Sequence, residues 1–389
     1  MPDLATVVAA VSVIAWIVLL GFRRGFWRAD QRLETGLAEP RHWPQVAALV
    51  PARNEAEHIE ACLAALGGQD YPGGFAVLVV NDASTDETAD IARRAARNPD
   101  IGRAVEVVDA PPLEAGWAGK LWALDHGIDH LKQRAVAPDY LWLSDADVVH
   151  EPATLRRLVA KAEAQDLALV SLMVRLACRS FWERLLVPAF VFFFQMLYPF
   201  PAINDRNSSM AGAAGGCMLL RWCVLDRTGG IAAIKDQLID DCALGARIKQ
   251  SGNGIWIGLG DESHSLRRYA ELARFWQMVA RSAFVQLRFS TILLIVSILG
   301  MAVTFVFAPL ILLAVPWHGS VLAAVLAAIS WTLMCVAYIP TVRYYGLEAW
   351  RSLTLPVASV LYMMMTLHSG IRHWCGLGQS WKNRAYRPK

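Results

Sequence analysis

Two aspartates, two positions apart, directly follow a short apolar run, and their spacing is the first sign of chemistry in the chain. The run Tyr140–Leu143 predicts a buried strand, and Asp145 and Asp147 come just after it. Residues i and i+2 of an extended chain point to the same side, so both carboxylates can face one object. Neighbouring carboxylates repel, and Mg²⁺ and Mn²⁺ take oxygen ligands, so a divalent cation could lie between them. Taken alone, the pattern fits a solvated turn equally well, and its context has to decide.

Further carboxylates recur at the same place in consecutive strand–helix units. Glu55 follows one short apolar run and Asp82 follows the next. Helical patterns separate these runs, which favours an α/β fold with a parallel sheet and ligand sites at the carboxyl ends of the strands. The predicted strands and the helices between them are Val46–Val50, 56–66, Phe75–Val80, a helix ending near Arg97, Val105–Val108 and 120–131.

Small and acidic residues mark two later loops. Gly215 and Gly216 precede the strand-like run Cys217–Arg221, without the spacing of a dinucleotide-binding loop. Small residues there would let the backbone approach a sugar. Asp240 and Asp241 begin an amphipathic helix, where first-turn carboxylates also serve as partners of the helix dipole.

The composition predicts a membrane protein. Of 389 residues, 55% are hydrophobic and 15 are Trp, which is too apolar for a purely soluble enzyme. The net charge of +3 is too small to imply nucleic acid as a partner. Basic residues instead cluster beside apolar runs, which suits an anionic lipid surface. The seven cysteines form no Cys-x-x-Cys pair, so neither a zinc site nor a disulfide framework is indicated, and reduced thiols in the cytosol are expected.

Apolar runs at both ends of the chain predict membrane segments. Residues 1–24 carry an uncharged run without the features of a cleaved signal, and the arginines that follow it place the next segment in the cytoplasm. Residues 291–371 hold three more runs, and the basic tail 372–389 is expected in the cytoplasm. Three complete spans would place that tail outside, so either one run is re-entrant or the charge rule does not hold here. The three runs are Ile292–Val315, Val321–Ile339 and Leu353–Ser369.

Two other segments are expected at the membrane surface. Residues 185–201 are very apolar but are interrupted by Pro188 and Gln195. A span here would separate the glycine and acidic motifs from Asp147, so the segment should lie in the interface or dock on the folded domain, with a buried core helix as the alternative. Residues 270–290 form an amphipathic pattern typical of an interfacial helix.

Five motifs stand in an order that resembles the inverting family 2 glycosyltransferases. The resemblance covers about Val46 to Arg288 and is strongest to a membrane-anchored group containing ceramide glucosyltransferase and the hopanoid-biosynthesis-associated glycosyltransferases. It implies a nucleotide-diphospho-sugar transferase fold, GT-A-like and Rossmann-type, in a cytoplasmic domain at 44–265. The motifs are Pro51-Ala-Arg-Asn-Glu55, Asn81-Asp-Ala-Ser-Thr-Asp86, Asp145-Ala-Asp147, Gly215-Gly216 and Asp240-Asp241.

The resemblance also implies roles for the residues that bind the donor. Asp82 would accept a hydrogen bond from a uracil ring, helped by Glu55 and the backbone of Ala52. Asp145 and Asp147 would hold Mg²⁺ or Mn²⁺ on the diphosphate, where the ion offsets charge on the leaving nucleotide.

Other matched positions would contact the sugar, the phosphates and the acceptor. Lys120 matches a position near the nucleotide and could add a phosphate contact, although an ordinary lysine at a helix start fits as well. Gly215 and Gly216 would line the sugar site. Asp241 matches the catalytic base that takes the proton of the acceptor hydroxyl, and Asp240 would orient or cap.

One motif departs from the family pattern. Processive relatives carry Gln-x-x-Arg-Trp on the interfacial helix, whereas this chain has Gln277-Met-Val-Ala-Arg281-Ser. Arg281 could still contact the diphosphate with Gln277 beside it. The missing Trp favours a single transfer over polysaccharide synthesis.

The sequence therefore predicts an inverting, metal-dependent glycosyltransferase that moves one sugar from a UDP-sugar to a membrane lipid. The expected acceptor is a hopanoid or other terpenoid, or a sphingolipid-like alcohol. A processive polysaccharide synthase and a catalytically silent, membrane-bound sugar-nucleotide-binding protein are the alternatives. The expected location is the cell inner membrane, with several spans and a cytoplasmic catalytic domain.

Overall fold

The computed structural model describes residues 3–101, 104–134, 136–237, 239–376, 379–381 and 384–386. The chain divides into two compact units. The sheet unit consists of Asp30–Ala177 and Ala202–Arg268. The helical unit consists of Met1–Ala29, Cys178–Pro201 and Tyr269–Lys389.

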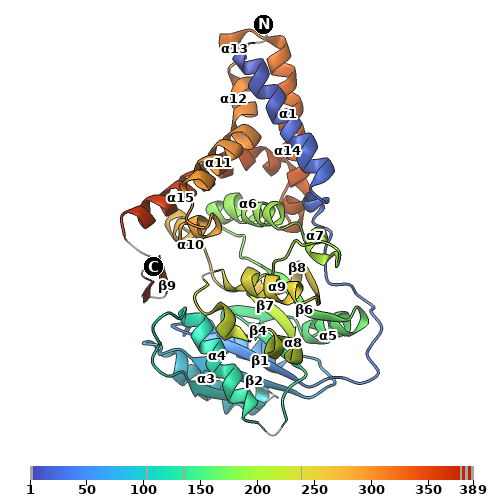
Figure 1. Cartoon of the computed structure of the whole chain (residues 1–389), viewed down its shortest axis with the longest axis vertical. Helices are drawn as coiled ribbons and strands as arrows, with labels where there is room; N and C mark the ends of the chain where they lie inside the picture. Colours follow the sequence, from blue (N-terminus) through green and yellow to red (C-terminus); the bar gives the residue numbers. More distant parts are fainter. Residues whose placement is uncertain are drawn as a thin grey trace. The chain divides into compact units, whose positions relative to one another are not determined.

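The sheet unit is built on a mixed sheet flanked by helices (Figure 1). The sheet has eight strands in the described part of the chain, in the order β3-β2-β1-β4-β7-β6-β8-β5. Strands β3, β2, β1 and β4 run parallel, as do β6 and β8. The strands are β1 Val46–Ala52, β2 Phe75–Asn81, β3 Ala104–Asp109, β4 Tyr140–Ser144, β5 Val148–His150, β6 Leu167–Arg175, β7 Cys217–Arg221 and β8 Gly254–Ser265.

The predicted parallel arrangement is confirmed for β1, β2, β3 and β4, but two further strands make the sheet mixed. β7 runs antiparallel to β4 and β6, and β5 runs antiparallel to β8. Cys217 pairs with Ser144, so β7 begins where β4 ends and has to run back along it. The amide of Asp145 donates to the carbonyl of Gly216 at 3.3 Å, which fixes the glycine loop beside the end of β4.

Helices cover both faces of the sheet. Val46, Ala48 and Val50 of β1 belong to the same buried cluster as side chains of α2, α3 and α5. The opposite face of β1 meets α4, where a side chain on Gly127 would lie 2.4 Å from Leu49. Burial on both faces explains why the strand is a continuous apolar run. The helices are α2 Ile59–Gly67, α3 Thr88–Ala96, α4 Gly119–Lys132, α5 Thr154–Ala164, α8 Trp222–Arg227 and α9 Asp240–Gln250, with α7 Phe200–Asn204 at the boundary between the units.

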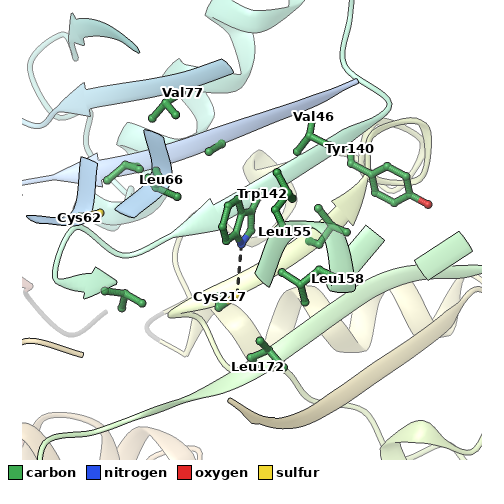
Figure 2. Close-up of a cluster of buried hydrophobic side chains, with 14 of the residues drawn as sticks. Val46, Cys62, Leu66, Val77, Tyr140, Trp142, Leu155, Leu158, Leu172 and Cys217 are labelled. Carbon is green, nitrogen blue, oxygen red and sulfur yellow. Dashed lines mark hydrogen bonds between the residues drawn. The ribbon is translucent and has the colours of Figure 1, made fainter. Parts of the chain in front are cut away.

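The core of the sheet unit holds β4 firmly in place. Trp142 is fully buried and its indole nitrogen donates to the sulfur of Cys217 at 3.4 Å, joining β4 to β7 (Figure 2). Side chains from the neighbouring strands and helices surround it, including Leu66, Leu155 and Leu172. A close-packed core of this kind resists displacement, so the residues at the end of β4 start from a rigid base.

The helical unit contains long apolar helices. Among the described residues, four are long and apolar enough to cross a bilayer: Leu4–Phe22, Thr291–Leu313, Val321–Tyr344 and Ala349–Trp374. The second contains a π-helical segment, Ala302–Val306. The elements are α1 Leu4–Phe22, α6 Phe181–Leu197, α10 Leu272–Gln286, α11 Thr291–Met301, α12 Phe307–Leu313, α13 Val315–His318, α14 Val321–Tyr344 and α15 Leu355–Trp374, with a short pair, β9 Gln379–Trp381 and β10 Arg384–Tyr386. The predicted basic tail falls partly outside the described residues.

Helix α1 packs along α14 (Figure 1). The hydroxyls of Ser12 and Ser330 are 2.7 Å apart and fully buried. Ala9 and Ala327 are also fully buried, and their small side chains allow the two helices to approach closely. The N-terminal helix is thus an integral part of the helical unit.

The apolar segment predicted at 185–201 forms most of α6. This helix starts with a capping box in which Ser180 and Glu183 bind each other's backbone. Its last carbonyls, at Met196 and Leu197, accept hydrogen bonds from Arg23. Because α6 is bonded in this way within the helical unit, docking on the sheet unit is not needed to explain its burial, and its place in the membrane interface stays a prediction.

Candidate active site

Four charged side chains meet near the carboxyl end of β4. The ammonium of Lys120, in the first turn of α4, lies 2.7 Å from Asp145 and 3.8 Å from Asp240. Asp241, next to Asp240 in the first turn of α9, accepts a hydrogen bond from the amide of Gly215 at 2.9 Å. We call Lys120, Asp145, Asp240 and Asp241 the lysine cluster.

The lysine cluster forms one wall of a small pocket. The remaining walls are mostly apolar. The lining residues are Pro51, Lys120, Leu121, Leu124, Leu143, Ser144, Asp145, Gly215, Met218, Ile231, Ile234, Asp240, Asp241 and Leu244.

Burial and charge shift the pKa values of this cluster. Burial, followed by the negative charge of Asp240, raises the pKa of Asp241 to about 6. Burial also raises the pKa of Asp145, against the opposing effect of Lys120. Burial by itself would lower the pKa of Lys120, but Asp145 and Asp240 outweigh it and raise that pKa. Lys120 therefore stays charged, while Asp241 can exchange a proton near neutral pH.

Two glycines precede β7 in closely packed positions, one beside the lysine cluster and one beside Val174. A Cβ on Gly215 would lie 3.3 Å from the carboxylate of Asp241 and from the ammonium of Lys120. A Cβ on Gly216 would lie 2.7 Å from a methyl of Val174. A side chain at Gly215 would be a tight fit, whereas one at Gly216 would force Val174 to move.

A second charged group lies beyond the turn that follows β4. The guanidinium of Arg267 donates through Nη2 to Glu55 at 2.6 Å and through Nε to Asp147 at 3.0 Å. The hydroxyl of Ser265 donates to the same oxygen of Asp147, also at 3.0 Å. We call Glu55, Asp147 and Arg267 the arginine bridge.

The two aspartates of the Asp-x-Asp motif therefore contact different cations. The amide of Val148 donates to the carbonyl of Asp145, which closes a turn at Ala146 and Asp147. The sequence argument assumed an extended chain, and the turn replaces it. Asp145 joins the lysine cluster and Asp147 joins the arginine bridge.

A neutral histidine makes hydrogen bonds beside this turn. The imidazole of His150 lies 2.9 Å from the hydroxyl of Ser144 and 2.8 Å from that of Ser263. Its complete burial lowers its pKa to about 3, so it carries no charge at neutral pH. The chain of hydrogen bonds connects the end of β4 to β8 and fixes both sides of the turn.

The loops after β1 and β2 are joined to each other. The amide of Asp82 donates to the carbonyl of Ala52 at 2.8 Å, and the amide of Glu55 donates to the hydroxyl of Thr88 at 2.7 Å. Asp82 is nearly fully buried. Asn54 and Ala83 both have positive φ angles, 50° and 48°, which are strained for residues other than glycine and are typical of functional loops.

The structure brings most of the predicted site residues together within the sheet unit. Gln277 and Arg281 are the exception, because they are exposed positions on α10 of the helical unit, and their role towards the donor stays a prediction. The sequence analysis missed Arg267, Ser265 and His150. Recognising β8 would have revealed the first two, because they lie at its carboxyl end, where ligand sites are expected.

The donor set suits a hard divalent ion. In the described part of the chain, no three His, Cys, Asp or Glu side chains form a ready-made metal cluster. Mg²⁺ and Mn²⁺ are usually held by only one or two carboxylates, with substrate phosphates completing the shell. Asp145 and Asp147 fit that chemistry, although each now contacts a basic side chain.

Similarity to a solved structure defines the class of fold. The mannosyltransferase PcManGT from Pyrobaculum calidifontis matches with a TM-score of 0.57 and 21% identity, covering 93% of this chain and 99% of that chain. This confirms the predicted GT-A-like α/β fold. The S. aureus protein TarS, residues 1–349, matches at a TM-score of 0.41 and 15% identity, covering 88% of this chain and 96% of that one.

The family follows from the sequence itself. Residues 44–281 match the family described as "Glycosyltransferase like family 2", which is more than half of the chain. The chain belongs to this family and is a glycosyltransferase. The glycosyltransferase AglE of Haloferax volcanii is 46% identical over 52 residues, which is 13% of this chain and 17% of AglE.

Proposed function

We propose that this protein is an inverting, metal-dependent glycosyltransferase that transfers a single sugar from a UDP-sugar to a membrane lipid. The observation that carries the proposal is the position of Asp241. Its carboxylate is held at the pocket by the amides of Gly215 and Cys242, in the same cluster as Asp145 and Lys120. A base and a phosphate-binding group are thus side by side.

Asp241 is the proposed catalytic base. The acceptor hydroxyl gives its proton to this carboxylate while its oxygen forms a bond to the anomeric carbon, and the bond to the leaving diphosphate breaks on the opposite side. One displacement of this kind inverts the anomeric centre. A raised pKa suits the role because a base works best when its pKa lies near the working pH. Asp240 raises that pKa and orients the helix start.

The donor is proposed to bind across the ends of β1, β2 and β4. Asp82, Glu55 and the backbone of Ala52 would hold the uracil, and Lys120 would approach the diphosphate. Asp145 and Asp147 would hold the divalent ion, which supplies positive charge to stabilise the leaving nucleotide. The solved complex of PcManGT with GDP-mannose and Mn²⁺ supports the use of a nucleotide sugar and a metal. The choice of uracil rests on the motif at 81–86.

The acceptor is proposed to be a lipid alcohol, either a hopanoid or other terpenoid, or a sphingolipid-like molecule. The apolar helices of the helical unit would bring the enzyme to the bilayer where such acceptors reside. Gln277 and Arg281 on α10 would add contacts to the diphosphate. The residue after Arg281 is Ser282 and not Trp, which favours one transfer over processive synthesis.

We also propose an inner-membrane location with a cytoplasmic catalytic domain. Helix α15 would lie in the interface, because its side chains bond to α6 and α10: Tyr362 to the Leu186 carbonyl and His368 to Trp276. This leaves three spans and places the basic tail in the cytoplasm, as its charge predicts.

Two exposed cysteines can test that topology. Cys223 lies in the sheet unit and Cys375 follows α15, whereas Cys217 is too buried to report. A membrane-impermeant maleimide should label neither from outside intact cells and both after permeabilisation. Outside labelling of Cys375 would show that α15 spans the bilayer, and outside labelling of Cys223 would contradict a cytoplasmic catalytic domain.

The activity itself is tested by transfer of label from a radioactive UDP-sugar to lipids extracted from membranes. One labelled lipid of fixed size is expected, with an anomeric configuration opposite to that of the donor. A labelled polymer would favour a polysaccharide synthase, and binding without any transfer would favour a silent binding protein. Comparison of the lipids of a deletion strain with those of its parent would identify the acceptor.

A further inference from the structure

Arg267 contacts Asp147, a carboxylate that the proposed function assigns to the metal. It follows β8, far in sequence from both of its partners, and holds Glu55 at 2.6 Å and Asp147 at 3.0 Å. The side chains of Glu55 and Asp147 are only 9% and 12% exposed, whereas that of Arg267 is 31% exposed. The cation is therefore the most accessible member of the arginine bridge.

The arginine bridge balances the charge of two carboxylates. Two nearly buried carboxylates repel each other and need a counter-ion. The planar guanidinium can bond to both at once, which an ammonium group does less well. Arg267 thus supplies the positive charge at Asp147 when no metal is bound.

The same contact obstructs a metal. One oxygen of Asp147, Oδ2, already accepts hydrogen bonds from Arg267 and from Ser265. A divalent ion at this oxygen would have to displace a donor, and it would also be repelled by the guanidinium charge nearby. Arg267 can leave Asp147 and keep its bond to Glu55, because different nitrogens make the two contacts.

We propose that Arg267 is a latch that occupies Asp147 until a divalent ion displaces it. This inference rests on the proposed metal site. The latch lowers the affinity of the free enzyme for metal, so the ion binds well only when the diphosphate of the donor supplies further oxygen ligands. Metal and donor therefore bind together, and Arg267 is a positioning residue that sets this order.

The first test measures Mn²⁺ binding to the full-length protein in detergent without nucleotide, by the loss of the electron paramagnetic resonance signal of free Mn²⁺. Arg267→Gln removes the charge and should bind Mn²⁺ about tenfold more tightly than the wild type, or better, since a nearby repulsive charge is lost. An unchanged or weaker affinity would overturn the latch.

Arg221→Gln is the matched control. Arg221 is 28% exposed and also pairs with a carboxylate, Glu163, but it lies opposite Tyr140 at the other end of β4. The affinity of the Arg221→Gln variant for Mn²⁺ should equal that of the wild type. A tenfold gain in this variant as well would show a general charge effect and would overturn the specific role of Arg267.

Asp147→Asn separates failure of the latch from failure of the metal site. If this variant loses Mn²⁺ binding while Arg267→Gln behaves like the wild type, only the latch is wrong. If Asp147→Asn binds Mn²⁺ as well as the wild type, the metal assignment is wrong and the latch falls with it.

A second measurement uses the wild-type chain and does not depend on how a variant folds. Phenylglyoxal modifies accessible arginines, and mass spectrometry can quantify the modification of Arg267 separately. Saturating Mn²⁺ should release Arg267 from Asp147 and increase its modification several-fold, whereas Arg221 should not change. Equal or lower modification of Arg267 with Mn²⁺ would contradict the latch.

Discussion

The lysine cluster and the arginine bridge solve the same problem with different chemistry. Each neutralises buried carboxylates with one basic side chain, but Lys120 serves three carboxylates and Arg267 serves two. The lysine cluster keeps an excess of negative charge, and its member Asp241 has a raised pKa. The arginine bridge is closer to neutral, because only two carboxylates share its guanidinium. The comparison fits the proposed roles, in which the first group supplies the base Asp241 and each group supplies one metal ligand, Asp145 and Asp147.

The largest expected effect comes from removing the metal ligand of the arginine bridge. Asp147→Ala should abolish turnover and weaken donor binding, because the diphosphate loses its counter-ion. Excess chelator should have the same effect on the wild type. Asp166→Ala, which removes a highly exposed carboxylate of the sheet unit, should keep normal activity. Full activity of the wild type in excess chelator would refute the metal assignment.

The next effect concerns the base of the lysine cluster. Asp241→Asn should lower turnover by roughly two to four orders of magnitude, the usual range for loss of a general base, and should still bind UDP with metal. Asp240→Asn should keep more activity, because the two side chains are about 100° apart around the helix and cannot share one role. UDP affinity by calorimetry and the transfer rate to lipid give both quantities for each variant. Normal transfer by Asp241→Asn would refute the assignment.

The pH dependence of kcat/KM should then report on the lysine cluster. A base with a pKa of about 6 is protonated as the pH falls, so kcat/KM should decrease below that pH, by about tenfold per unit. In Asp240→Asn this limb should move to lower pH, because a neighbouring negative charge no longer raises the pKa of Asp241. If the acid side of the pH profile does not move in Asp240→Asn, the lysine cluster does not determine that side of the profile.

The smallest expected effects come from the glycine loop. Gly215→Ala places a methyl 3.3 Å from Asp241 and Lys120, so those groups must shift by a few tenths of an ångström, and turnover should fall several-fold with little loss of stability. Gly216→Ala meets Val174 at 2.7 Å and should instead lower the free energy of unfolding by about 1–3 kcal/mol, as overpacking does. Thermal unfolding and turnover of both variants check this. Equal effects of both variants on turnover would contradict the distinction.

The sequence predicted the elements of the sheet unit well where the signals were local. The strands β1, β2 and β4 were recognised as continuous apolar runs, and the helix predicted at 120–131 corresponds to α4. Strand direction could not be obtained in that way, because β7 owes its antiparallel course to pairing with β4 and β6, more than 40 residues away in sequence.

The same limit applies to the candidate site. Asp145, Asp240 and Asp241 were found from their motifs, and the structure brings them together around Lys120. Arg267 was missed because β8 was not predicted and because its partners are 212 and 120 residues away. The turn at Ala146 was missed because a single polar pair after a strand fits an extended chain as well as a turn.

The buried pair Ser12 and Ser330 has a consequence for the biogenesis of the protein. The two residues are separated by 318 positions, so α1 must wait for most of the chain before its partner exists. At about 5–20 residues per second, that delay is about 15–60 s. During this time the close-packing face of α1 has no partner helix, and the Ser12 hydroxyl lacks its eventual bond. Synthesis of the N-terminal helix and assembly of the helical unit are therefore separate events, and a chain that stops before α14 leaves the first helix without its partner.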